Sequence, residues 1–186
     1  MVYLNGVIYS SFGGYQKEFK KYTVGTNTWS DLADMPDLTY AGSAPVTDGT
    51  YIYAFRGSNT TDFWRYNVAT DRWSVINSPP ATIGAGGTLS YSGGYLYATR
   101  GGSTQTFYRY DISAGTWSAM TNVPATIADN TNMDVNGNFI YLSRGQATTT
   151  LYRYSISGNS WTTMTTLPQA SRYVGTVYNS HDGYRD

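Results

Sequence analysis

Arginines at a fixed spacing are the polar side chains of this sequence best suited to chemistry. Arg56, Arg100 and Arg144 are separated by steps of 44 residues. A guanidinium is planar and carries five N–H donors, so three of them near one axis could hold a carboxylate, sulfate or phosphate through forked hydrogen bonds. The same groups could instead stack on aromatic rings or donate to loop carbonyls. Because the series repeats, the sequence favours this structural role and leaves the anion site as the alternative.

A second arginine series follows the same 44-residue step, and the same two roles, structural or anion-binding, are open to it. Arg65, Arg109 and Arg153 form it, and Lys21 stands at the equivalent position nearer the N-terminus. The first series has Phe12 at its corresponding position. Catalytic sites in repeated folds usually break the symmetry, so these two regular series favour structure or binding over catalysis.

Aromatic residues at the same spacing are the second candidate for a binding site. Trp64, Tyr108 and Tyr152 follow Phe63, Phe107 and Leu151 by one residue. Successive side chains of a strand point to opposite faces, so the two sets are expected on opposite faces of a sheet. We expect both sets to pack against neighbouring sheets. The alternative is a surface that binds sugar or protein, with Thr, Ser, Asn and Gly of the loops as adaptable partners.

Groups for acid–base, redox or metal chemistry are scarce. The chain has no cysteine, a single histidine (His181) and a single glutamate (Glu18). Asp31, Asp34 and Asp37 lie close together, but their spacing fits no calcium-loop motif, so a solvated acidic loop is expected. We therefore expect no catalytic residues, no metal site and no cofactor.

The charge balance narrows the possible partners. Lys and Arg number 12, as do Asp and Glu, and charged residues make up 13% of the chain. Recognition of nucleic acid normally needs a basic excess, so no nucleic-acid partner is expected. No apolar run reaches the length of about 20 residues that crosses a membrane. The N-terminus lacks the basic start and apolar run of a signal peptide.

An internal repeat of 44 residues sets the organisation of the chain. Four series of residues keep this step without insertion or deletion: Trp29, Trp73, Trp117 and Trp161; Tyr9, Tyr53, Tyr97 and Tyr141; Tyr22, Tyr66, Tyr110 and Tyr154; Pro36, Pro80, Pro124 and Pro168. Fixed self-similarity of this length is typical of repeat architectures.

Each copy has the pattern of four short strands. In the third copy, runs of aromatic and β-branched residues are separated by Gly, Ser, Asn and Pro; these runs span 86–91, 95–100, 106–111 and 116–120. No stretch has sustained helical periodicity. Four antiparallel strands per 44 residues predict an all-β fold, a β-propeller of four blades.

The repeated residues are similar to the kelch repeat. An apolar strand ending in tyrosine (Val7-Ile8-Tyr9) leads to Gly13-Gly14, then to Tyr22, and then to the turn and tryptophan of Thr26-Asn27-Thr28-Trp29. Two copies depart from the double glycine, with Gly57-Ser58 and Gly145-Gln146. The resemblance is to a divergent bacterial or viral branch, and it implies a kelch-like propeller.

The predicted domain spans 1–179 and is followed by a tail, 180–186. Its copies run roughly over 1–41, 42–85, 86–129 and 130–173, and residues 173–179 are expected to supply a closing strand. That strand could close a four-bladed ring within the chain, or it could exchange into a second copy to form a homodimer with an eight-bladed ring. The chain could also be part of a larger propeller.

Three classes of function fit these features. A non-enzymatic module that binds protein or glycan, or that has a structural role, is favoured; we expect it to be extracellular, on a cell surface or on a virus particle. The first alternative is a self-assembling unit that forms rings or fibres. The second is a sugar enzyme resembling the sialidases or epimerases built on propellers, although a carboxylate pair would have to come from aspartates. Fold alone does not choose among them.

Overall fold

The computed structural model describes residues 1–12, 14–40 and 45–170, and these residues form four antiparallel sheets. The first contains β1 (Val2–Leu4), β2 (Val7–Ser11), β3 (Phe19–Thr23) and β4 (Thr28–Asp31). The second contains β5 (Val46–Thr47), β6 (Tyr51–Phe55), β7 (Phe63–Asn67) and β8 (Arg72–Val75). The third contains β9 (Thr88–Ser92), β10 (Tyr95–Thr99), β11 (Phe107–Asp111) and β12 (Thr116–Ala119). The fourth contains β13 (Asn132–Asn136), β14 (Phe139–Ser143), β15 (Leu151–Ser155) and β16 (Ser160–Thr163).

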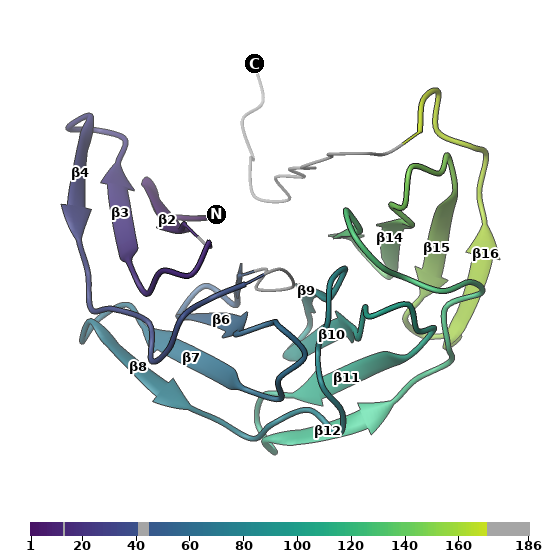
Figure 1. Cartoon of the computed structure of the whole chain (residues 1–186), viewed down its shortest axis with the longest axis horizontal. Helices are drawn as coiled ribbons and strands as arrows, with labels where there is room; N and C mark the ends of the chain where they lie inside the picture. Colours follow the sequence, from purple (N-terminus) through teal and green to yellow (C-terminus); the bar gives the residue numbers. More distant parts are fainter. Residues whose placement is uncertain (13, 41–44, 171–186) are drawn as a thin grey trace.

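The four sheets are the blades of a propeller and follow one another along an arc (Figure 1). In every blade the strands pair in sequence order. The first strands of adjacent blades are in contact, β1 with β5, β5 with β9 and β9 with β13, and the fourth strands lie on the outside of the arc. The all-β fold with four four-stranded blades is therefore confirmed. Within the described residues no helix is long and apolar enough to cross a membrane.

Tight turns connect the first two strands of a blade. Asn5 and Gly6 join β1 to β2 as a two-residue loop, with φ angles of 49° and 81°. Gly93 and Gly94 join β9 to β10 in the same way, with φ angles of 57° and 86°. Two consecutive left-handed residues match the twist of a hairpin, which explains Asn-Gly and Gly-Gly at these turns.

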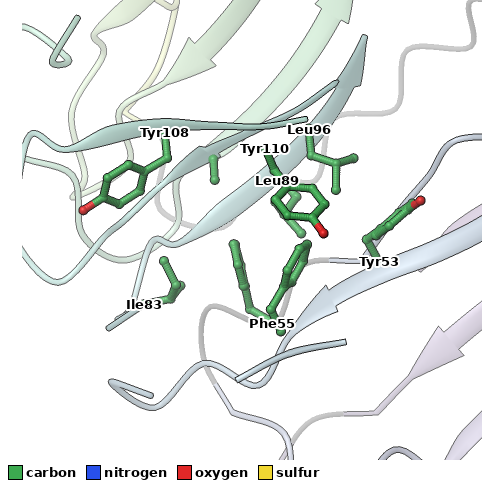
Figure 2. Packing of buried hydrophobic residues seen from close by; sticks show 9 residues of the cluster. Tyr53, Phe55, Ile83, Leu89, Leu96, Tyr108 and Tyr110 are labelled. Atoms are coloured by element: carbon green, nitrogen blue, oxygen red, sulfur yellow. The ribbon is translucent and has the colours of Figure 1, made fainter. Parts of the chain in front are cut away.

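The hydrophobic core lies between the blades rather than within one. Each of the three interfaces between adjacent blades, which we call joints, contains its own buried cluster. Figure 2 shows the joint between the second and third blades, where Phe55 and Ile83 face Leu96 and Tyr110. Aromatic rings fill much of this space because both faces of a blade are covered by neighbours.

The alternation predicted along the third strand is confirmed at these joints. Phe63 packs toward the third blade, in a cluster with Tyr110, while Trp64 packs toward the first blade, in a cluster with Phe19. Phe107 and Tyr108 are divided in the same way between the joints on the two sides of the third blade.

A hydrogen-bonded clasp adds to the packing of each joint. At the first joint, Tyr66 Oη donates to Asp71 Oδ1 at 2.7 Å, and the Ala33 N–H donates to the same oxygen at 2.8 Å. Trp73 Nε1 then donates to the Ala33 carbonyl at 3.0 Å. A residue leaving the outer strand of one blade is thus held by a turn and a tryptophan of the next.

The clasp recurs at the other two joints with different residues. At the third joint, Asn159 Oδ1 accepts from Tyr154 Oη at 2.7 Å and from the Thr121 N–H at 3.0 Å, and Trp161 Nε1 donates to the Thr121 carbonyl at 2.9 Å. At the second joint Gly115 occupies the turn position. Its carbonyl accepts from Asn77 Nδ2 at 2.6 Å, while Trp117 Nε1 donates to the Asn77 carbonyl at 2.8 Å.

The residues expected to close the ring, 173–179, and the tail, 180–186, lie outside the described residues. Among the residues described, the first and fourth blades form the two ends of the arc (Figure 1). Closure within the chain, closure with a second copy and membership of a larger propeller therefore stay predictions.

Candidate functional site

The first arginine series holds the connections between blades. Arg56, Arg100 and Arg144 directly follow the second strands of their blades. Each Nε donates to a carbonyl 18 residues earlier, in the segment that joins two blades; these carbonyls belong to Leu38, Thr82 and Thr126, at 3.3, 3.1 and 3.2 Å. These contacts are the ones that the structural role requires. Binding of an anion by the series stays a prediction.

The second arginine series stacks on aromatic rings within its own blades. The Cζ atoms of Arg65, Arg109 and Arg153 lie 4.4, 4.5 and 4.5 Å from the ring centroids of Tyr51, Tyr95 and Phe139. In the first blade both partners are replaced, by Lys21 and Val7. The arginine and its ring are thus present together or absent together, which indicates that each is kept for the cation–π contact.

The aromatic candidates Trp64, Tyr108 and Tyr152 are buried, with exposed fractions of 2%, 7% and 5%. Trp64 and Tyr108 lie in the first and second joints, and Tyr152 lies in the third. Their contacts are those of packing between blades. The binding role considered for them stays a prediction that these contacts do not support, because little ring surface is left for a ligand.

One face of the propeller gathers its longer loops. The loops between second and third strands pair there with the segments that connect blades, through isolated bridges between Gln16 and Thr39, Thr60 and Ile83, and Thr104 and Ile127. We call this the loop face. The first arginine series lies on it, since each arginine begins one of these loops.

A group of aromatic and charged side chains breaks the symmetry of the loop face. Arg56 Nη1 lies 3.1 Å from Asp62 Oδ2, and Arg56 Nη2 lies 3.0 Å from Asp37 Oδ2. The Arg56 guanidinium is also 5.9 Å from the ring centroid of Tyr40. The Tyr40 ring meets the Tyr15 ring edge to face, with 4.6 Å between centroids. We call Tyr15, Asp37, Tyr40, Arg56 and Asp62 the loop-face cluster.

Ion pairs link the charged residues of the cluster. The hydrogen bond to Asp62 and the charge of Asp37 raise the pKa of the Arg56 guanidinium, so it stays protonated. Lys17 approaches from the other side, with Nζ 3.9 Å from Asp37 Oδ1 and donating to the Pro36 carbonyl at 3.3 Å. The two carboxylates are therefore balanced by two cations, and both aspartate side chains remain partly exposed.

Tyr15 is the most unusual residue of the cluster. Its φ is 71°, in the left-handed region, and its side chain is 70% exposed. The equivalent residues, Asn59, Ser103 and Ala147, are also left-handed but small. A bulky residue at such a φ is strained by roughly 1–3 kcal/mol, and strain of this kind gathers at functional sites. Apart from its edge-to-face contact with Tyr40, the ring packs into none of the buried clusters of the described residues.

Sequence reasoning did not find this cluster. Asp37 was expected in a solvated acidic loop, and Tyr15 and Tyr40 were not singled out at all. The available signal was the position of Tyr15, where the other copies have Asn, Ser or Ala. Within the described residues, no group of three or more His, Cys, Asp or Glu side chains is arranged to hold a metal ion.

The four-stranded blades form a β-propeller, and comparison with known proteins finds a repeat motif in part of it. The Kelch motif family model matches residues 39–80. No curated protein sequence matches the chain. A solved structure titled "Structure of YjhT" matches with a TM-score of 0.73 and 14% sequence identity.

The YjhT match covers 89% of this chain and 64% of that one, and at this identity it shows the fold alone. The chain is a kelch-repeat-like β-propeller, as the resemblance of its repeats predicted. It spans 64% of the length of the YjhT structure. The kelch propeller fold suggests a binding or structural module.

Proposed function

We propose that the chain is a non-enzymatic binding module that recognises a glycan through the loop-face cluster. The observation that carries this proposal is Tyr15, a ring that is 70% exposed and held at a φ of 71°. The other copies show that the turn needs only a small residue at this position. The ring is therefore available for contact with a ligand.

The chemistry of the cluster suits a sugar. A sugar ring has an apolar C–H face, which can cover an exposed aromatic ring, and a rim of hydroxyl groups that need hydrogen-bonding partners. Asp37 and Asp62 can accept from hydroxyls, while Arg56 fixes both carboxylates at 3.0 and 3.1 Å. A module of this kind suits the outside of a cell or a virus particle, which is the location we propose.

A protein partner is the second candidate, and the composition of the cluster favours it. Tyrosine and arginine are the residue types that often dominate protein interfaces, and Tyr15 and Tyr40 lie beside Arg56. Ser, Thr and Gly in neighbouring loops would supply adaptable contacts around them.

The proposal is tested by binding of the chain to a glycan array, followed by titration of the best ligand. Tyr15→Ser copies the residue of the third blade, so the fold should be kept while the ring is lost. We expect binding to weaken at least about tenfold, which corresponds to about 1.4 kcal/mol. Val75→Ser removes another exposed apolar side chain as a control and should leave binding unchanged.

A second pair of variants separates the cluster from the arginine series. Arg56→Lys removes the fork that holds Asp37 and Asp62, and binding should weaken. Arg100→Lys changes the equivalent residue outside the cluster and should not affect binding. An array without any bound glycan overturns the glycan proposal and directs the search to proteins. Equal losses in both arginine variants would assign the site to the arginine series instead.

A further inference from the structure

The two ends of the arc present the two halves of a joint. The side of the first blade that no described blade covers contains Tyr22, Asn27 and Trp29, and we call it the leading face. The corresponding side of the fourth blade contains Leu151, with Thr165 just after β16, and we call it the trailing face. Under the 44-residue step these residues are equivalent to those that meet at the three interior joints.

The leading face has its half of the clasp already formed. Tyr22 Oη donates to Asn27 Oδ1 at 2.8 Å, as Tyr66 does to Asp71 in the complete clasp. The Tyr22 and Trp29 rings are 5.3 Å apart, close to the 4.9–5.1 Å of the equivalent pairs inside the propeller. Trp29 is nevertheless 52% exposed, and the described residues offer its Nε1 no carbonyl.

The trailing face offers the complementary half. Within the described residues Thr165 takes part in no clasp, whereas its equivalents Ala33 and Thr121 give both their N–H and their carbonyl to one. Leu151 is half-buried, whereas its equivalents Phe63 and Phe107 are completely covered by the next blade. Each exposed group on one face thus matches an exposed group on the other.

We propose that the trailing face of one copy docks on the leading face of a second copy. Three interior joints of the same chain show which surface fits each face, so the occupant is identified by internal repetition. The faces lie at opposite ends of the arc (Figure 1), which keeps them apart within one copy as long as the interior joints keep their geometry. The contact is heterologous, and two such contacts related by a twofold axis would close a ring.

The charged residues of the leading face are compatible with docking. Lys20 stands where the other blades have Trp64, Tyr108 and Tyr152. Its Nζ lies 2.8 Å from Asp31 Oδ1 and 3.6 Å from Glu18 Oε2, so its charge is balanced within the first blade. Its hydrocarbon stem can pack against the opposing blade while the ammonium stays with these carboxylates at the edge.

Light scattering on a sizing column tests the proposal with the whole chain. We expect a mass of twice the 20.5 kDa of one copy. Trp29→Ala removes the ring and the indole donor of the leading face, and Leu151→Glu places a charge on the trailing face. Each should reduce the mass to that of one copy. Val75→Ala, at a similarly exposed apolar residue away from both faces, should not.

A mixture of the two variants is the sharper test. The Trp29→Ala copy keeps a trailing face and the Leu151→Glu copy keeps a leading face, so the mixture should form a two-copy complex through one joint. Circular dichroism of each variant shows whether its fold is kept. A larger mass that both variants reduce also supports docking, as an open chain of copies. A single-copy mass of the unmodified chain overturns the proposal.

Discussion

The first joint and the leading face contain the same kinds of residue, but only the joint is complete. At the joint, Asp71 accepts two hydrogen bonds and Trp73 donates one to the preceding blade. On the leading face, Tyr22 is the one described residue that donates to the Asn27 side chain, and Trp29 has half of its surface exposed. The turn and ring pair thus form without a partner among the described residues, so each blade builds its half of the clasp from its own residues. Packing of the neighbouring blade then buries the tyrosine and tryptophan rings.

The largest difference between joint and end face is expected from buried rings. Phe63→Ala removes a completely buried ring that contacts Tyr110 and Trp117 across the second joint, and should cost about 3–5 kcal/mol. Leu151→Ala, at the equivalent half-buried position on the trailing face, should cost about 1 kcal/mol in the isolated chain. Urea unfolding at low protein concentration measures both. If both variants lost the same free energy of unfolding, the trailing face would be covered in solution.

A smaller effect is expected from alkaline pH, which acts on the tyrosines of the joints. Burial and the charge of Tyr97 raise the pKa of Tyr154 to about 12. In the unfolded chain a tyrosine ionises near pH 10, so the folded state holds this proton more tightly. Stability should stay level below about pH 10 and fall as the pH rises toward 12, by roughly 2 kcal/mol for this residue.

Tyrosinate absorbance and circular dichroism, followed together against pH, measure this effect. Tyr154→Phe removes the ionisable group, so its stability should fall less steeply over the same range. A Phe variant with the same pH profile as the unmodified chain would place the sensitivity elsewhere.

The smallest difference is expected between the turn residues of the clasps. Asp71 and Asn27 have φ angles of 52° and 55°, so alanine at either position meets the same backbone strain. Asp71→Ala leaves two donors without an acceptor, and Asn27→Ala leaves one. We expect the Asp71 variant to lose about 1 kcal/mol more, measured by thermal unfolding. If the losses are equal, the hydrogen bond from Ala33 contributes nothing to the joint.

The blades were predictable from the sequence because every blade repeats one solution to the same packing problem. The third-copy strands expected at 95–100 and 106–111 are β10 and β11, within one residue at each end. The alternation of Phe63 and Trp64 also predicted that the two side chains pack on opposite faces of the blade. These properties depend on residues close together in one strand, whose periodicity is visible in the sequence.

The loop-face cluster was not predictable in the same way. Tyr15, Asp37 and Arg56 come from three different segments, and their approach depends on how the first two blades are joined. This contact between segments occurs once in the part of the chain that the structure describes, so no periodic pattern in the sequence predicts it. The acidic residues were noticed as a group, but only the fold shows that Asp37 pairs with Arg56 while Asp31 pairs with Lys20.

The clasps have a consequence for how such a chain can change its length. In every clasp, the hydrogen bonds that cross from one blade to the next join residues 38 or 40 positions apart, which is less than one 44-residue copy. A duplication or deletion of one whole copy would therefore leave every remaining clasp with both of its halves. Each blade is held only by the blades next to it. A gene can therefore gain or lose one blade at a time without changes in the blades already present.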